Sequence, residues 1–464
     1  MPLKVVLINP YELGRQPFAL AEAAAWLAEA GFSVKCTDLS LQKLDSAALA
    51  EADMVAVYLG MHTATRIAME ALPRIRELAP SAHLCAYGLY APMNEQLLRD
   101  LGISTIIGGE PEPALLELST RLSQGEQICQ TTPDIRVDKI QFAVPRRDLL
   151  PDLERYAHLI LPSGEKRVVG FAEGTRGCKH FCRHCPVVPI YEGKFRVIPV
   201  AVVMADIRQQ IAAGARHISF GDPDFFNGPT HAMNIVRELH HEFPDVTYDA
   251  VIKIQHLINH ADLLPQLKQT GCLFITAAVE SVDDQILDYL LKNHTHADYE
   301  KAVALCREAE IAIAPTFVAF NPWITLEGYI DLLQSLVELK LVEAVPPIQL
   351  TIRLLIPAGS HLLQLPGFTD CIGPFDPAIL GHPWHHPDPK VDRLQKAVQD
   401  VVANGEKEAI SRREIFERVW HLAHEMAGKI APSLSGVDFG SPIPHMSEPW
   451  YCCAEPTNQQ LQSF

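Results

Sequence analysis

Three cysteines stand close together in the segment "TRGCKHFCRHCPVVP". Cys178, Cys182 and Cys185 follow the spacing C-x3-C-x2-C, which lets one loop turn three thiolates toward a single centre. Thiolates are soft ligands that suit iron–sulfur clusters, and three of them on a cubane leave one iron open for chemistry. Zinc is the competing interpretation, with His180 or His184 as the fourth ligand.

A second group of thiols occurs in "WYCCAEP", where Cys452 and Cys453 are adjacent. Adjacent cysteines rarely bond to each other, because the resulting ring strains the peptide between them. Two neighbouring thiolates can instead chelate a soft, thiophilic centre such as As(III), Hg(II) or Cu(I). The alternative is a frayed terminus with incidental cysteines, although buried cysteines usually lie within apolar patterns that this segment lacks.

The elements that must position these thiols form two alternating series of strands and helices. In residues 1–145, short apolar runs such as "KVVLINP" and "ADMVAVYLG" alternate with helical patterns, which is typical of a parallel sheet covered on both faces. A second series in residues 146–362 gives about six β/α units, enough for most of a barrel. Residues 363–464 begin with a Pro-, Gly- and His-rich stretch and continue as a long helical pattern and an irregular end.

The predicted fold class is therefore α/β. We expect an N-terminal Rossmann-like domain, a partial (β/α)6 barrel, and a mostly helical or irregular C-terminal region. In such barrels the chemistry takes place at the C-terminal ends of the strands.

Composition limits the kinds of protein this chain can be. With 464 residues, 48% hydrophobic and 20% charged, it has the make-up of a globular protein of two or three domains. A formal net charge of −17 argues against nucleic acid or anionic membrane as the main partner. There is no secretory signal and no run of ~20 apolar residues, and the cysteine spacing suits metal ligation better than disulfides. We expect a cytoplasmic protein with reduced thiols.

The cysteine loop resembles the cluster-binding loop of radical S-adenosylmethionine (SAM) enzymes. "FGDPDFF" is placed like the family's second-strand motif, which implies that Gly221, Asp222 and Asp224 hold the SAM amino group. "AVESVDDQIL" is similar to the family's G-x-E-S strand end, which implies that Glu280 and Ser281 lie near the SAM ribose and carboxylate. The resemblance implies a [4Fe-4S] cluster on the three cysteines of the loop, SAM on its open iron, and reductive cleavage of SAM.

Residues 1–140 resemble the cobalamin-binding domain that precedes many radical SAM barrels, most clearly in "GGEPEPAL". In the form of that domain that ligates cobalt through histidine, an Asp is followed three places later by His, and residues 1–140 lack this pattern. Cobalamin bound without a histidine ligand and a fold kept only as a scaffold both remain open.

The letters "CCAEP" match the tail of a group of radical SAM proteins that end in CCAEP or CUAEP and include arsinothricin biosynthesis enzymes. This resemblance implies that Cys452 and Cys453 hold As(III), with Cys371 or Cys272 as a third thiol. It also implies transfer of the 3-amino-3-carboxypropyl group of SAM to arsenic, with formation of a C–As bond. Flavodoxin or ferredoxin is the implied type of electron donor.

Two other functions compete with this hypothesis. One is a cobalamin-dependent radical SAM methyltransferase or methylthiotransferase, the latter requiring three further cysteines for a second cluster. The other is a noncatalytic, thiol-based sensor or carrier of metalloids, which leaves the SAM-like motifs without a purpose.

Overall fold

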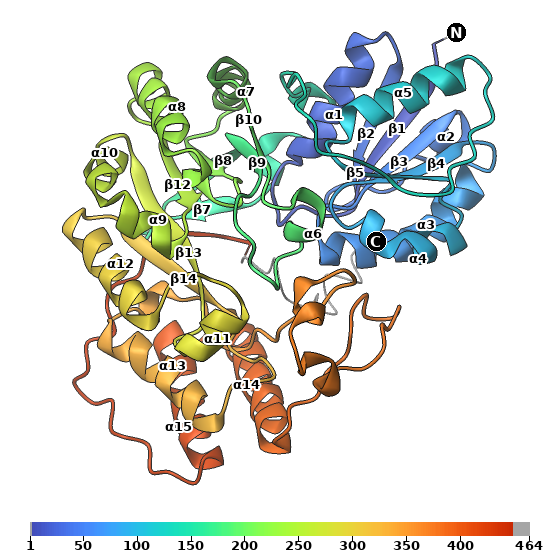
Figure 1. The fold of residues 1–464 in the computed structure, drawn as a ribbon. Helices are drawn as coiled ribbons and strands as arrows, with labels where there is room; N and C mark the ends of the chain where they lie inside the picture. The colour runs from blue at the N-terminus through green and yellow to red at the C-terminus, as the bar shows by residue number, and fades with distance from the viewer. Residues whose placement is uncertain (1, 449–464) are drawn as a thin grey trace.

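The computed structural model describes residues 2–448, apart from the side chain of Thr369. Two sheets dominate the structure, one built by the N-terminal third of the chain and one by the middle third, and helices flank both (Figure 1). This arrangement confirms the α/β fold class. No helix within residues 2–448 combines the length and the apolar character that a membrane span requires.

The N-terminal sheet has six parallel strands in the order β2-β1-β3-β4-β5-β6. The strands are β1 Lys4–Asn9, β2 Ser33–Asp38, β3 Met54–Tyr58, β4 His83–Tyr87, β5 Thr105–Gly109 and β6 Asp134–Arg136. The helices are α1 Phe18–Glu29, α2 Ser46–Ala50, α3 His62–Leu78, α4 Glu95–Asp100 and α5 Glu112–Ser123. Apolar residues of α1 and α5 pack on one face, and those of α2, α3 and α4 pack on the other. This is the doubly wound arrangement, in which ligands bind at the C-terminal ends of the strands.

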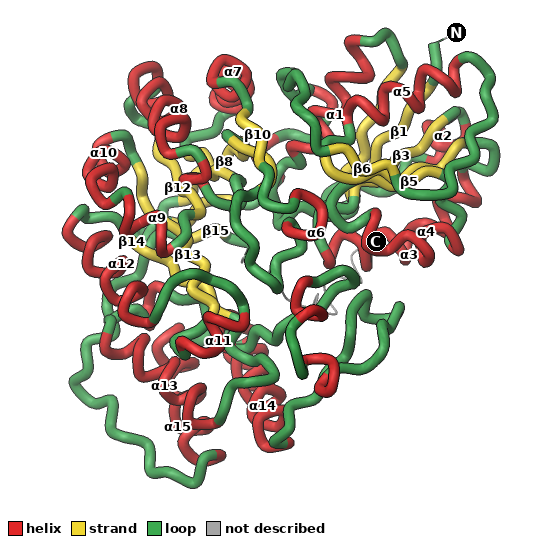
Figure 2. Tube along the Cα trace, viewed as in Figure 1, coloured by secondary structure: helices red, strands yellow, loops and turns green. Residues whose placement is uncertain are grey.

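The second sheet has the order β14-β13-β12-β11-β8-β7-β15 and curls as a partial barrel (Figure 2). Its parallel strands are β8 Lys166–Ala172, β11 His217–Phe220, β12 Thr247–Val251, β13 Cys272–Glu280 and β14 Ala312–Phe317. Two short strands, β7 His158–Ile160 and β15 His445–Met446, continue the sheet in antiparallel fashion. A separate two-stranded ribbon joins β9 Thr175–Gly177 to β10 Phe195–Val197.

Helices cover the outer face of this sheet. They are α7 Val200–Ala212, α8 Pro229–Glu242, α9 Ile254–Asn259, α10 Leu264–Gln269, α11 Asp284–Tyr289, α12 His296–Glu308 and α13 Leu326–Glu338. The short helix α6 Val188–Tyr191 follows the cysteine loop.

The sixth β/α unit differs from the sequence expectation. The segment "PPIQLTIRLLIP" forms a 3-10 turn at Pro347–Leu350 and joins the sheet only through a parallel bridge between Phe320 and Arg353. Proline lacks the backbone N–H that a ladder needs, and the prolines of this segment account for the interruption.

The C-terminal region forms two helices, α14 Pro389–Lys407 and α15 Arg412–Met426, where the sequence pattern suggests one long helix. Ala409 has φ +54° and ends the first helix, and the Ser411 side chain caps the second. Both helices share the apolar core of the barrel, so they belong to that body.

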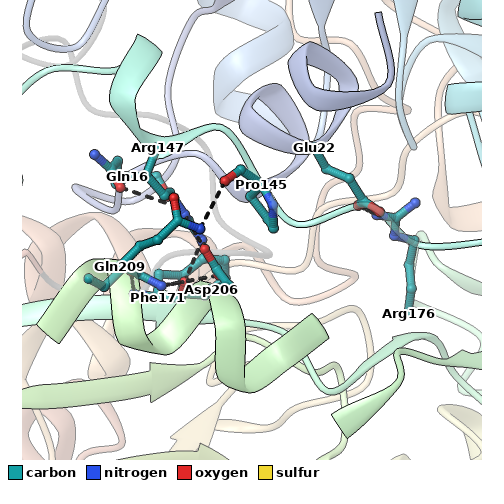
Figure 3. Close-up of polar contacts among 9 residues, drawn as sticks. Gln16, Glu22, Pro145, Arg147, Phe171, Arg176, Asp206 and Gln209 are labelled. Carbon is teal, nitrogen blue, oxygen red and sulfur yellow. Dashed lines mark hydrogen bonds and ion pairs between the residues drawn. The ribbon is translucent and has the colours of Figure 1, made fainter. Parts of the chain in front are cut away.

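A buried arginine connects the linker, the N-terminal domain and the barrel (Figure 3). Arg147 donates two hydrogen bonds of 2.8 Å to the carboxylate of Asp206 on α7. It also donates to the backbone carbonyls of Gln16 and Phe171. These bonds fix the N-terminal sheet relative to the barrel.

Candidate active site

A cavity of about 340 Å³ lies where the C-terminal ends of the two sheets meet. The N-terminal sheet contributes Tyr58 and Gly109 to its wall, and the barrel contributes Gly221, Val251 and Glu280. Both types of sheet bind ligands at this end of their strands. The volume is at the lower limit of ordinary small-molecule sites.

The three clustered cysteines, predicted from the sequence as cluster ligands, all line this cavity. Cys178 and Cys182 are buried, Cys185 is partly exposed, and none of the three is in a disulfide. Gly177 leads into the loop with φ +78°, and a Cβ there would lie 2.6 Å from the carbonyl oxygen of Lys194. Only glycine fits this position, so the backbone before Cys178 is tightly determined.

The spacing of these thiols suits a cluster better than a single metal ion. A tetrahedral zinc ion with Zn–S bonds of ~2.3 Å needs its sulfurs within about 4 Å of one another. In residues 2–448, the one group of three such ligand atoms within 4.8 Å consists of His180, Asp224 and His256, and it contains no cysteine. His184, the other expected zinc ligand, is paired with Glu280 at 3.3 Å.

The carboxylates of the second-strand motif face away from the cavity wall, which includes Gly221 but neither aspartate. Asp222 accepts hydrogen bonds from the Thr175 hydroxyl at 2.6 Å and from the backbone N–H of Gly174 at 2.9 Å. Burial raises the pKa of the Asp222 carboxyl to about 7. The side chain of Asp222 thus supports the strand that leads into the cysteine loop.

Asp224 is paired with two histidines, His180 at 3.1 Å and His256 at 2.6 Å. Although burial opposes ionisation, these hydrogen bonds hold the pKa of the Asp224 carboxyl below its usual range. Because His180 lies inside the cysteine loop, Asp224 anchors that loop to the barrel.

Glu280 lines the cavity from the end of β13, as expected. It has φ +71° and lies at an irregularity in the pairing with β14. Its carboxylate is 3.1 Å from the Lys292 ammonium, and although burial opposes ionisation, Lys292 and His184 lower the pKa of Glu280. The Ser281 hydroxyl oxygen accepts a hydrogen bond from the backbone N–H of Asp283, and Ser281 does not line the cavity.

Lys292 belongs to the cavity wall, and sequence reasoning missed it. The residues on either side, Leu291 and Asn293, have φ +55° and +59°. Positive φ values at residues other than glycine cost free energy, and such strain concentrates at functional sites. No spacing in the sequence marks this lysine, because its position depends on these backbone angles.

Three further glutamates line the cavity, Glu12, Glu112 and Glu173, and the sequence analysis missed them. Arg176 makes ion pairs with the buried residues Glu22, Glu110 and Glu112 (Figure 3 shows Glu22). Burial raises the pKa of Glu173 to about 8. Burial likewise raises the pKa of Glu12, which lines the cavity from the loop before α1, to about 7.

Cys452 and Cys453 lie outside the described residues. The described chain ends at Glu448, whose carboxylate accepts a hydrogen bond from the Tyr11 hydroxyl. Glu448 lines a second cavity of about 380 Å³, which shares residues such as Arg15 and Thr316 with the first. Cys452 follows Glu448 by four positions in the sequence, and a fully extended chain of that length spans at most about 14 Å.

The two cysteines considered as a third thiol are placed differently from each other. Cys272 is buried at the start of β13, and burial raises its pKa well above the usual thiol value. Cys371 is partly exposed at the end of a 3-10 turn. Neither Cys272 nor Cys371 lines either of the two cavities.

The chain matches the radical SAM superfamily over residues 173–324, which include the cysteine loop and Glu280. Residues 173–324 form a radical SAM domain. Among curated proteins, the chain is similar to two tRNA-2-methylthio-N(6)-dimethylallyladenosine synthases. The protein from Aliivibrio fischeri is 23% identical over 45% of this chain and 46% of its own length. The protein from Vibrio vulnificus is 24% identical over 43% of this chain and 44% of its own length. The chain thus spans less than half the length of these relatives.

Two solved radical SAM enzymes share the fold. The methyltransferase TsrM from Kitasatospora setae, solved with tryptophan and a SAM analogue, has a TM-score of 0.59 at 21% identity over 72% of this chain and 71% of its own. The cobalamin-dependent enzyme OxsB, solved with aqua-cobalamin and SAM, has a TM-score of 0.70 at 14% identity. The match covers 87% of this chain and 67% of OxsB. Both matches extend well beyond the radical SAM domain.

The radical SAM domain implies a [4Fe-4S] cluster and SAM as cofactors, and the residues present fit both. Cys178, Cys182 and Cys185 supply three cysteine side chains to the cavity wall. The same cavity extends past Gly221 and Glu280, which leaves room for a single small molecule beside the cluster.

Proposed function

We propose that this protein is a radical SAM transferase that moves the 3-amino-3-carboxypropyl group of SAM to trivalent arsenic. The observation that carries the proposal is the position of Glu448. It lies on a cavity that shares wall residues such as Arg15 and Thr316 with the thiol-lined site, and the sequence continues from there into the adjacent Cys452 and Cys453.

Each part of the site has a role in this reaction. The cluster on Cys178, Cys182 and Cys185, when bound, supplies the electron that breaks a C–S bond of SAM. Glu280 and the backbone at Gly221 border the proposed SAM site, and the mostly apolar wall of the cavity limits contact of the carbon radical with water. The tail thiols hold soft As(III) as thiolates.

The proposed reaction balances in atoms and electrons. One electron from a flavodoxin- or ferredoxin-type donor cleaves the Cγ–S bond and gives methylthioadenosine and the aminocarboxypropyl radical. The radical forms a C–As bond with trivalent arsenic. Arsenic then returns one electron to the carrier and becomes pentavalent. The product belongs to the class of intermediates of arsinothricin biosynthesis.

The test is an anaerobic assay with the reconstituted full-length protein, SAM, a reductant and arsenite. Methylthioadenosine together with a new C–As compound is the expected result. Cleavage to 5′-deoxyadenosine, or formation of S-adenosylhomocysteine, contradicts the proposal.

A cobalamin-dependent methyltransferase is the second candidate, because TsrM and OxsB share the fold and were solved with cobalamin. The residues at the N-terminal sheet do not fit a corrinoid. The Tyr58 ring occupies the space next to Gly60 and Gly88, where an added Cβ would lie 2.6 and 2.9 Å from its atoms. Failure to bind aqua-cobalamin would exclude this candidate.

A further inference from the structure

Lys253 is a buried lysine on the wall of the thiol-lined cavity. It follows β12 and immediately precedes α9, and 5% of its surface is exposed. Its ammonium nitrogen lies 3.4 Å from the sulfur of Cys182, within hydrogen-bonding distance of a thiolate. This is a direct contact between a cation and one of the three clustered cysteines.

The surroundings do not otherwise compensate the charge of Lys253. The other buried lysine of the wall, Lys292, has the Glu280 carboxylate at 3.1 Å. Within residues 2–448, no carboxylate oxygen lies within 4.0 Å of the Lys253 ammonium, and its one hydrogen bond is with Cys182. An isolated buried ammonium costs several kcal/mol of solvation free energy, so an anion is expected at this position.

The backbone holds Lys253 firmly in place. Its N–H donates to the Asp224 carboxylate at 3.3 Å, and its carbonyl accepts hydrogen bonds from His256 and Leu257 at 2.9 and 3.0 Å. Asp224 also anchors the cysteine loop through His180. The same carboxylate therefore fixes both partners of the contact between Lys253 and Cys182.

We infer that Lys253 raises the reduction potential of the cluster by donating a hydrogen bond to the Cys182 sulfur. Reduction adds negative charge to the cluster and its thiolates, and a fixed positive charge at 3.4 Å stabilises the reduced state more than the oxidised state. Lys253 is a positioning residue that acts through Cys182. The inference applies to any acceptor and does not depend on the arsenic reaction.

The test is an anaerobic redox titration of the reconstituted protein without SAM, followed by electron paramagnetic resonance. Lys253→Met is expected to lower the midpoint potential at unchanged iron and sulfide content, and Lys253→Arg to restore it toward the original value. Lys179→Met is the matched control. Lys179 lies inside the cysteine loop, but its ammonium donates to the backbone carbonyl of Asn227 at 3.2 Å. This variant should keep the original potential.

Equal midpoint potentials in the original protein and Lys253→Met would overturn the inference. If the potential is equal but SAM binds more weakly in equilibrium dialysis, the ammonium serves the SAM carboxylate instead, and the inference also fails. Should Lys253→Met assemble no cluster, Lys253→Gln keeps a hydrogen-bond donor without the charge. Its potential must then fall below the original value.

Discussion

Arg147 and Asp206 form a bidentate ion pair in which both hydrogen bonds are 2.8 Å long, and both side chains are almost completely buried. The arginine comes from the linker and the aspartate from α7. The pair therefore holds the N-terminal sheet against the barrel, and the thiol-lined cavity exists only where these two bodies meet.

Asp206→Asn should lower the free energy of unfolding by about 3–5 kcal/mol, because it leaves the buried Arg147 charge without its partner. Urea unfolding measures this loss. Replacing both residues, as Arg147→Met with Asp206→Leu, should be less damaging than the single change. A single variant as stable as the original protein would contradict the structural role of the pair.

Cys182→Ser should abolish the [4Fe-4S] cluster, because two cysteine ligands remain on the cavity wall. Iron and sulfide analysis with the absorption spectrum after anaerobic reconstitution checks this. Cys129→Ser, at an exposed cysteine far from the loop in sequence, is the control and should keep full iron content. Zinc bound stoichiometrically in place of iron would refute the cluster assignment.

Gly177→Ala should reduce cluster occupancy severalfold, because its Cβ would lie 2.5 Å from the Tyr191 ring and 2.6 Å from the carbonyl of Lys194. Gly164→Ala is a matched control, since Gly164 also has a positive φ but no atom within 4 Å of the added Cβ. It should cost only about 1 kcal/mol of stability and leave iron content unchanged. Equal iron content in both variants would contradict the prediction, because it would show that the cysteine loop can accommodate a Cβ at position 177.

The variant with both Cys452→Ser and Cys453→Ser should lose arsenic transfer by at least a hundredfold while keeping its cluster, because soft As(III) requires thiolates. Product analysis by mass spectrometry with arsenic detection measures the loss, and the iron content shows that the site is otherwise intact. Cys371→Ser provides a comparison with a thiol that does not line either cavity. Undiminished turnover in the double variant would remove the tail from the mechanism.

Glu12→Gln should make stability less dependent on pH between about 4.5 and 7. Burial raises the pKa of Glu12 from 4.5 to about 7 in the folded protein. The folded state therefore holds a proton that the unfolded state releases, and stability falls as pH rises through this window, by up to about 3 kcal/mol. Urea unfolding across this range tests the slope, with the exposed Glu308→Gln as control. Identical slopes for Glu12→Gln and the original protein would contradict the prediction.

The cysteine loop and the alternation of strands and helices were predictable because they depend on local spacing and periodicity. Cys178, Cys182 and Cys185 lie within eight positions, so any loop conformation keeps them together. The direction of a side chain at a strand end depends on the tertiary structure. The motif therefore could not reveal that the Asp222 carboxylate bonds the strand leading into the cysteine loop, or that the Asp224 carboxylate pairs with His180 inside it.

Lys253 and Lys292 lie on the cavity wall for reasons that the sequence does not display. Lys253 follows strand β12 and Lys292 follows helix α11, and neither element has a composition that marks a site. Both lysines share the cavity wall with the cysteine loop, which comes from a distant part of the chain. Lone lysines are usually solvated, so residue type alone argues against a role at this site.

The pairing of β15 with β7 joins parts of the chain that are made at very different times. The Ser447 hydroxyl oxygen accepts a hydrogen bond from the backbone N–H of His158, a residue 289 positions earlier in the sequence. At ribosomal rates of roughly 5–20 residues per second, the β7 edge stays uncovered for on the order of 15–60 s during synthesis. Newly made chains therefore pass through a period in which an open strand edge invites aggregation.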